Sequence, residues 1–253
     1  MNVVRTPGVD LKSRRFWCCV LAEALGTFMF VSVILGSSCP GPGSSAPPPM
    51  LQGALAAGFS AVGLIHCFGE ISGAQVNPAI TMALLCTRRV DLLHAVAYIL
   101  AQCLGATLAS GMFYLLTPQT AVSYLVTRVS SDGNAGQALV LEVFSTFQLA
   151  FTIFAVEDHR RREVAEPGPL AIGFSLTAGA LTAVYWIGPV LGSVLAGVSY
   201  EFFFASSASR EKLVACITCK DIEIVETVSI SRSSLSTATQ TAMRAKQASK
   251  HDN

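Results

Sequence analysis

The sequence predicts an all-α membrane protein, a bundle of apolar helices built as an inverted repeat with one re-entrant half-helix. Hydrophobic residues make up 52% of the 253-residue chain and charged residues only 13%, which is too apolar for an ordinary soluble domain. Several apolar runs have about 20 residues, the length that crosses a bilayer as a helix. Related patterns also recur in the two halves of the chain.

The apolar runs predict six membrane spans in a domain over residues 14–204. The predicted spans are residues 16–36, 50–68, 91–116, 137–156, 169–184 and 185–204. The last two divide one continuous apolar run, so a tight hairpin and a single long tilted span both remain open. Residues 1–13 are expected to form a cytoplasmic arm. Residues 205–253 are expected to form a disordered cytoplasmic tail, because they are polar and rich in Ser and Thr.

Basic residues predict the orientation of the spans. With spans one to four alternating, the basic residues at the span ends all fall on one side of the membrane. They are Lys12, Arg14, Arg15, Arg88, Arg89 and the arginines at 160–162. Because basic residues gather on the cytoplasmic side, the N-terminus is expected in the cytoplasm.

A short stretch between spans two and three does not fit a full span. It reads ISGAQVNPAIT, residues 71–81. Gly73 allows a sharp turn, Asn77 can cap a helix, and Pro78 suits the first helical position. The apolar residues 79–86 then give only about two turns, ~13 Å, or half a bilayer. We therefore predict a loop that enters the membrane and returns as a half-helix.

The two halves of the chain share two patterns. Glu23 precedes Thr-Phe by four residues, and so does Glu142. Gly-Phe-Ser occurs at 58–60 and again at 173–175. Because three spans separate the copies, the copies have opposite orientations, as in inverted-repeat channels and transporters.

This symmetry predicts a second Asn-Pro-Ala near residue 192, and the chain does not contain one. It reads Leu-Gly-Ser at 191–193, and Asn77 is the only asparagine that precedes a proline. We therefore expect the second half-helix to be missing, with roughly 25 residues lost by comparison with the first repeat.

The segment at 77–79 resembles the first Asn-Pro-Ala signature of the aquaporin (major intrinsic protein) family, and is most similar to its water-selective branch. The resemblance covers roughly residues 14–204. Four further segments resemble helices of the family: 23–28, 101–106, 170–175 and 185–189. The resemblance implies a multi-pass channel for passive transport of water, with small neutral solutes as a second class. It also implies a homotetramer in the plasma membrane.

The resemblance also implies roles for particular residues. The expected pore or water-binding residues are Gly73, Asn77, Pro78, Ala79, Ala57 and Ala180. Asn77 would donate hydrogen bonds to water, beside a helix N-terminus whose dipole opposes cations. Ala57 stands where the water-selective pattern has Phe, and Ala180 where it has His, while the constriction Arg lies in the missing segment.

Glu23 and Glu142 lie inside predicted spans, where a charge is costly, so both are expected to face the bundle interior. The resemblance implies that they brace the re-entrant loops. Gln102 is expected to hydrogen-bond between helices.

Three hypotheses follow for function. The first is a passive channel, whose partners are water and membrane lipid. The second is a non-conducting truncated subunit that forms hetero-oligomers with full-length family members and modulates them. The third is a proton-coupled or ion-coupled transporter that titrates Glu23 or Glu142. No nucleophile–base pair, phosphate loop or metal cluster stands out, so we expect no enzyme, cofactor or metal. A net charge of +1 suggests no nucleic-acid partner.

Overall fold

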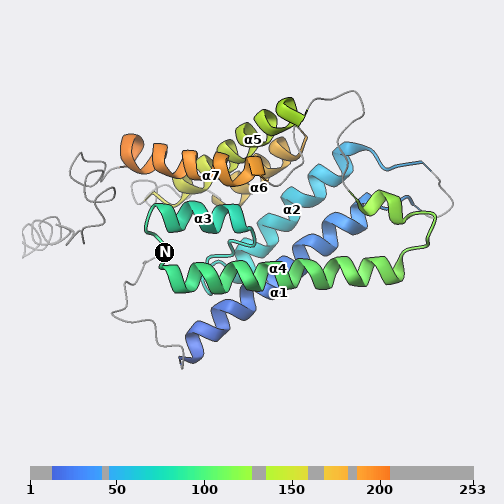
Figure 1. The fold of residues 1–253 in the computed structure, drawn as a ribbon, viewed down its shortest axis with the longest axis horizontal. Coiled ribbons are helices and arrows are strands. Elements are labelled where there is room, and N and C mark those ends of the chain that lie inside the picture. The colour runs from blue at the N-terminus through green and yellow to red at the C-terminus, as the bar shows by residue number, and fades with distance from the viewer. Residues whose placement is uncertain (1–12, 42–45, 127–134, 159–167, 182–186, 206–253) are drawn as a thin grey trace, which may run out of the picture. The chain divides into compact units, whose positions relative to one another are not determined.

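The computed structural model describes residues 13–41, 46–126, 135–158, 168–181 and 187–205, all within the compact unit Met1–Ala208. Every regular element in these ranges is a helix (Figure 1). The α-helices are α1 (Arg14–Ser38), α2 (Met50–Phe68), α3 (Pro78–Cys86), α4 (Leu92–Leu116), α5 (Ala135–Val156), α6 (Gly168–Ala180) and α7 (Ile187–Ser199). A 3-10 turn (Val122–Leu125) follows α4, and a π-helical turn (Tyr200–Phe204) continues α7. Most of the predicted arm and tail lies outside the described residues.

Four helices, α1, α2, α4 and α5, are long and apolar enough to cross a membrane. Each begins and ends within two residues of its predicted span. Polar side chains at two helix starts account for part of this agreement. Asp91 accepts hydrogen bonds from the backbone N–H groups of Leu93 and His94 at the start of α4, and Ser13 accepts one from Arg15 at the start of α1.

The run 169–204 forms two helices, so a single long tilted span is wrong. The predicted boundaries also need correction, because α6 ends at Ala180 instead of residue 184, and α7 begins at Ile187 instead of residue 185. Apolar composition is continuous between residues 169 and 200, and no charged residue lies there, so hydropathy alone does not mark the helix ends. Residues 182–186, which join the two helices, lie outside the described residues.

Helix pairs pack in the same way in the two halves of the chain. A Cβ built on Gly105 of α4 would lie 2.2 Å from the Ala24 carbonyl oxygen of α1. A Cβ on Gly192 of α7 would lie 2.2 Å from the Val143 carbonyl oxygen of α5. Small residues that let backbones approach this closely are typical of helix packing in membranes. The α1–α4 pair and the α5–α7 pair are therefore equivalent.

A reciprocal contact between α2 and α6 relates the two halves. A Cβ on Gly58 would lie 2.6 Å from the Gly173 carbonyl oxygen, and a Cβ on Gly173 would lie 2.7 Å from the Gly58 carbonyl oxygen. These glycines belong to the two Gly-Phe-Ser copies that the sequence singled out. The contact places the repeats as an inverted pair, as predicted.

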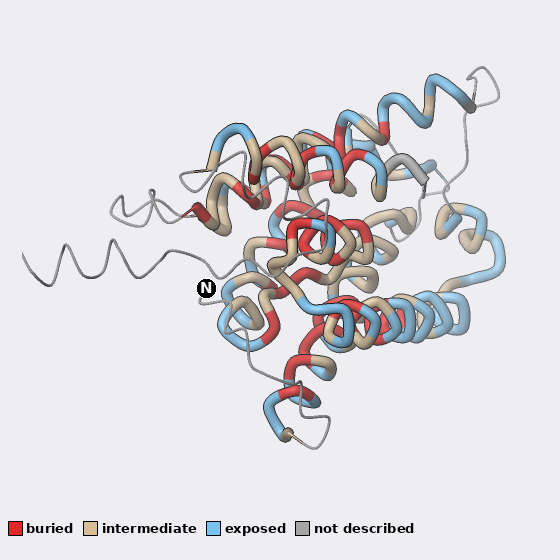
Figure 2. Tube along the Cα trace, turned by 60° about the vertical axis from the view of Figure 1, so that its left-hand side comes forward, coloured by how far each residue is buried: buried red, intermediate tan, exposed pale blue. Residues whose placement is uncertain are grey.

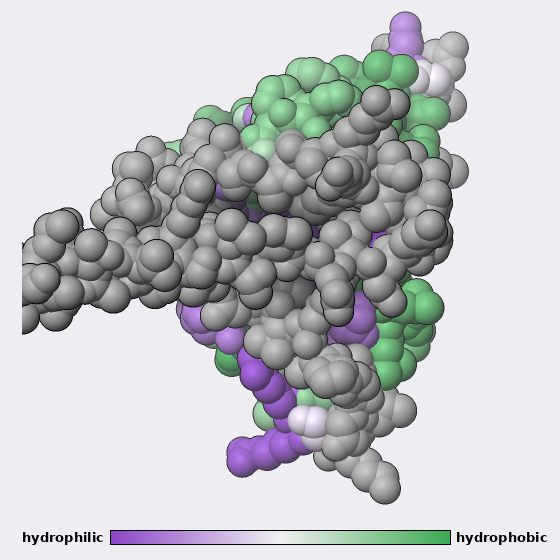
Figure 3. Space-filling view, turned by 90° about the vertical axis from the view of Figure 1, so that its left-hand side faces the viewer, coloured by the Kyte–Doolittle hydropathy of each residue, from purple (hydrophilic) through white to green (hydrophobic). Residues whose placement is uncertain are grey.

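Many large hydrophobic side chains of the helices are exposed. The buried residues lie where helices meet (Figure 2). Leu21, Leu100 and Phe144 are each more than 60% exposed, an arrangement that suits a lipid environment. Seen from the left-hand end of Figure 1, hydrophobic residues lie at the upper and right-hand margins, and hydrophilic ones gather lower down (Figure 3). Half-helix α3 is packed into the interior against α7 and α4.

Candidate functional site

The re-entrant loop between α2 and α3 has a strained backbone. Gly73, Ala74 and Val76 have positive φ angles of 96°, 48° and 40°. Glycine adopts such angles freely, but Ala74 and the β-branched Val76 do so at a cost of order 1–3 kcal/mol each. Interactions from outside the loop must therefore hold it in place.

Glu23 of α1 supplies those interactions. Its side chain is fully buried, and one carboxylate oxygen accepts hydrogen bonds from Ser72 Oγ at 2.6 Å and Gln75 N at 3.0 Å. The other oxygen accepts from Val76 N at 2.8 Å and from Gln102 Nε2 at 2.8 Å. Four donors fill the four lone-pair sites of an ionised carboxylate. The buried charge is thus satisfied, and it fixes the strained loop.

Half-helix α3 begins at the residues that the sequence predicted. Asn77 is its N-cap, and Asn77 Oδ1 accepts a hydrogen bond from Ala79 N at 2.9 Å. Pro78 occupies the first helical position, where a missing N–H costs nothing. The nine residues of α3 span about 13 Å at 1.5 Å per residue. The half-buried Asn77 amide therefore lies at a positive helix terminus within the bundle.

A second polar network continues from Glu23 into the loop. Gln102 Nε2 of α4 donates to Thr81 Oγ1 of α3 at 3.0 Å, and Thr81 Oγ1 donates to Gln75 Oε1 at 2.7 Å. Gln75, Thr81 and Gln102 are each at least nine-tenths buried. The sequence predicted an interhelical role for Gln102 but assigned none to Gln75 or Thr81. The spacing of these residues gives no signal, because the network depends on how α4 meets the loop.

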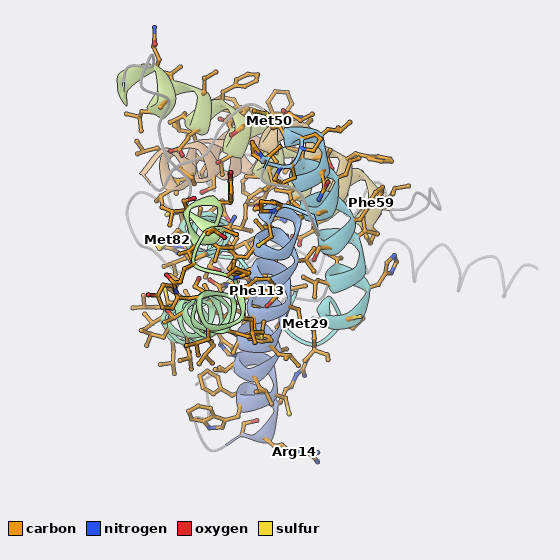
Figure 4. All side chains as sticks on the ribbon, turned by 90° about the vertical axis from the view of Figure 1, so that its right-hand side faces the viewer. Arg14, Met29, Met50, Phe59, Met82 and Phe113 are labelled. Carbon is orange, nitrogen blue, oxygen red and sulfur yellow. The ribbon has the colours of Figure 1, made fainter. Side chains whose placement is uncertain are left out.

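The two alanines proposed for the constriction lie on different helices. Ala57 of α2 is 5% exposed, whereas Phe59, two residues further on, is 61% exposed and points away from the bundle (Figure 4). Ala180 is half-buried and is the last residue of α6. The structure therefore brings Gly73, Asn77, Pro78 and Ala79 together where the re-entrant loop meets the start of α3. Ala57 and Ala180 lie on separate helices of the α2–α6 pair.

Glu142 lies on α5 at the position that corresponds to Glu23 on α1, and it is 2% exposed. In the first repeat, the loop braced by Glu23 follows α2. In the second repeat the corresponding connection follows α6, and it falls at residues 182–186, outside the described residues. That Glu142 braces a loop therefore stays a prediction.

Two contacts that the sequence analysis missed tie α3 to the second repeat. Ser193 of α7 is fully buried and donates its hydroxyl to the Ala79 carbonyl oxygen at 2.7 Å. At the other end of α3, Arg89 Nη1 lies 3.1 Å from Glu157 Oε2, and Arg89 Nη2 lies 2.8 Å from Glu201 Oε2. An acidic residue within the apolar run 169–204, Glu201, was the available signal, because a buried carboxylate requires a partner.

The site presents hydrogen-bond donors at a helix N-terminus, an arrangement that attracts oxygen atoms of neutral or anionic molecules and opposes cations. Within the described ranges, no group of three or more His, Cys, Asp or Glu side chains could hold a metal ion.

Comparison with known proteins identifies the family to which this chain belongs. Residues 10–184 match the family model described as Major intrinsic protein. The chain is 40% identical to Aquaporin-4 of Mus musculus over 230 residues, covering 79% of this chain and 71% of the relative. It is 37% identical to Aquaporin-5 of Homo sapiens, covering 82% of this chain and 89% of the relative.

A solved structure supports the fold. An aquaglyceroporin from Plasmodium falciparum superposes with a TM-score of 0.63 at 18% identity, covering 73% of this chain and 95% of that one. At this identity the likeness concerns the fold alone. The family match and the identity to the two aquaporins show more: the chain is an integral membrane protein of the major intrinsic protein family, the aquaporin family of membrane channels.

Proposed function

We propose that this protein conducts water passively, along a path lined by the re-entrant loop and the start of α3. The observation that carries the proposal is the complete first half-site. Glu23 holds the loop through four hydrogen bonds, and Asn77 Oδ1 is occupied by Ala79 N. The Asn77 Nδ2 group is thereby oriented to donate to a passing oxygen atom. Relatives named Aquaporin-4 and Aquaporin-5 support the same function.

Small neutral solutes form the second proposed class. The resemblance to the water-selective branch predicts Phe and His at two constriction positions, and this chain has Ala57 and Ala180 there. Both alanines are small, so the path is proposed to be wider than a tight water filter. Glycerol and urea are suitable test solutes, because both are uncharged and carry acceptor oxygens.

The non-conducting subunit is the second candidate function, and a specific observation favours it. Gly58 and Gly105 are 47 residues apart, but their counterparts Gly173 and Gly192 are only 19 apart, which is 28 fewer. The alignment with mouse Aquaporin-4 spans 230 residues, whereas 79% of this chain is about 200 residues. Both figures support a missing second half-helix. Such a chain would then modulate full-length family members in hetero-oligomers.

The coupled-transporter hypothesis has less support. Each carboxylate oxygen of Glu23 accepts two hydrogen bonds, and these four bonds hold the loop. No lone pair of the carboxylate therefore remains free for a transported proton. Residues 14–204 are proposed as the channel domain, with the N-terminal arm and the tail in the cytoplasm. The plasma membrane and a homotetrameric assembly remain proposals drawn from the family.

Osmotic shrinkage of proteoliposomes, followed by stopped-flow light scattering, tests the proposal. Vesicles with a known amount of inserted protein are expected to show water permeability above empty vesicles, and Asn77→Ala is expected to lower it. An imposed pH gradient should not change the rate, whereas a coupled transporter would respond. Permeability equal to that of empty vesicles would reject the channel. Co-purification with a co-expressed full-length relative would then test the subunit hypothesis.

A further inference from the structure

We propose that the start of α1 binds an anionic phospholipid of the bilayer, with Arg14 and Arg15 on the headgroup phosphate and the apolar residues that follow along an acyl chain. The inference concerns a site away from the proposed water path and does not depend on conduction. Arg14 and Arg15 belong to the first turn of α1, and both residues are exposed. Figure 4 shows Arg14 at the end of α1, directed away from the other helices.

The two arginines carry positive charge that no carboxylate in the described ranges neutralises. Neither forms an ion pair with a described residue, whereas Arg89 binds both Glu157 and Glu201. The first turn of α1 also contains no acidic residue. Guanidinium groups bind phosphate through paired hydrogen bonds in addition to their charge, so this helix end suits an anionic phosphate group.

The neighbouring helix ends carry negative charge instead. The Phe16 ring lies 4.9 Å from the His94 ring, which places the start of α4 beside the start of α1. There Asp91 caps α4, and its side chain is 48% exposed. Glu70, just after the end of α2, is exposed as well. Because like charges repel, an anionic headgroup is disfavoured at these two ends and attracted to the start of α1.

The residues that follow the arginines identify the phosphate as that of a lipid. Trp17, Leu21 and Leu25 follow Arg14 at intervals of three or four residues and therefore share one face of α1. They are 58%, 65% and 45% exposed. Tryptophan is typical of the membrane–water interface, and the helix rises about 12 Å from Trp17 to Leu25, within the ~15 Å hydrocarbon depth of one leaflet. An acyl chain can pack along this face, whereas inorganic phosphate gains nothing from it.

Quenching of tryptophan fluorescence by brominated lipids tests the site, because bromine quenches only at close range. The chain has two tryptophans, Trp17 and Trp186, so Trp186→Phe leaves one reporter at the site. Subtracting the signal of Trp17→Phe from that of the wild-type chain gives the same quantity without this variant. Vesicles contain phosphatidylserine and phosphatidylcholine, with one of the two brominated at a time. The expected preference for phosphatidylserine at Trp17 is about 25-fold, since each basic residue near an anionic surface contributes about fivefold.

Substitutions of the arginines test their role in this preference. Arg14→Gln and Arg15→Gln are each expected to lower it about fivefold, and the double variant to abolish it. Both residues are exposed, so these variants should fold. Lysine at both positions keeps the charge and should retain most of the preference. Arg89→Gln is the matched control, because it removes the same charge from an arginine that is already paired, and it should leave the preference unchanged.

Three results would overturn the inference. The first is equal quenching by the two lipids, or a preference that survives in the Arg14→Gln, Arg15→Gln double variant. The second is displacement of phosphatidylserine by millimolar inorganic phosphate, which would indicate a site for free anions. The third is no quenching by either lipid, which would show that protein covers this face of α1. A chain that shows the preference but does not conduct water would reject the proposed function and leave the lipid site standing.

Discussion

The first and second repeats share a helical frame but differ in what lies between the helices. In both repeats, a glycine on the last helix packs against a backbone carbonyl oxygen of the first helix. The glycines are Gly105 and Gly192, and a Cβ built on either would lie 2.2 Å from that oxygen. In the first repeat, a braced loop and half-helix α3 separate α2 from α4. In the second, α7 follows α6 after a connection of six residues, 181–186. The packing of α1 on α4 and of α5 on α7 therefore does not require a re-entrant segment, because it depends on close contacts between those helices.

The second repeat also contacts half-helix α3 directly. Ser193 donates to the first turn of α3, and Arg89 joins the end of α3 to Glu157 and Glu201 while lying 4.5 Å above the Phe154 ring. These contacts hold α3 from both of its ends. Hydrogen bonds and ion pairs thus join the re-entrant loop, half-helix α3 and the second repeat. Single substitutions can measure how much each contact contributes to stability.

The largest expected effect is on the brace of the first repeat. Glu23→Ala removes the acceptor of four donors and releases a strained loop, so it should lower the free energy of unfolding by at least about 4 kcal/mol. Thermal unfolding in detergent, followed by circular dichroism, measures this. Thr27→Val is the control on the same helix, because it removes only a bond to the Glu23 carbonyl oxygen, and should cost below about 1 kcal/mol. Equal melting temperatures for the two variants would contradict the bracing role.

The equivalent helix packing in the two repeats predicts equal effects of two glycine substitutions. Gly105→Ala and Gly192→Ala each place a Cβ 2.2 Å from a backbone oxygen, and each should destabilise the protein by about 2–3 kcal/mol. Gly111→Ala is the control on α4, because nothing lies within 4 Å of its Cβ position, and it should be neutral or stabilising. The unfolding midpoints of the variants, measured side by side, test this. A shift for only one of Gly105→Ala and Gly192→Ala would contradict the equivalence of the two repeats.

Arg89 tests the link at the end of α3. Arg89→Ala removes the cation shared by Glu157 and Glu201 and is expected to cost about 2 kcal/mol, since the pair is only partly screened by solvent. Arg15→Ala removes an exposed arginine and should stay within about 0.5 kcal/mol of wild type. An Arg89→Ala variant as stable as Arg15→Ala would show that the ion pairs do not hold the half-helix.

The smallest expected effect concerns Ser193. Ser193→Ala removes one buried hydrogen bond to the Ala79 carbonyl oxygen and should cost about 1 kcal/mol. Thr107→Ala, which removes an exposed bond within α4, should cost less. If the order of the two melting temperatures were reversed, Ser193 would not be stabilising α3.

Much of this architecture was predictable from the sequence, because it depends on local patterns. Runs of about 20 apolar residues located α1, α2, α4 and α5, and the order Asn77-Pro78 located the start of α3. The repeated Gly-Phe-Ser predicted the α2–α6 relation, which the reciprocal glycine contact shows directly.

The remaining features depend on tertiary contacts. The end of α6 at Ala180 lies inside a long apolar run, where no charged residue marks it. The partners of Arg89 lie 68 and 112 residues away, and Thr81 and Gln102 meet only because α3 and α4 pack together. Spacing along the chain cannot reveal such pairs.

The central claim is that the first repeat's half-site suffices for a water path. The direct test is the osmotic water permeability of proteoliposomes holding a known amount of folded, inserted wild-type protein, compared with empty vesicles and with Asn77→Ala. The account predicts permeability well above empty vesicles, and a lower value for Asn77→Ala. Wild-type permeability equal to that of empty vesicles would contradict it, and would favour a subunit that acts only beside full-length relatives.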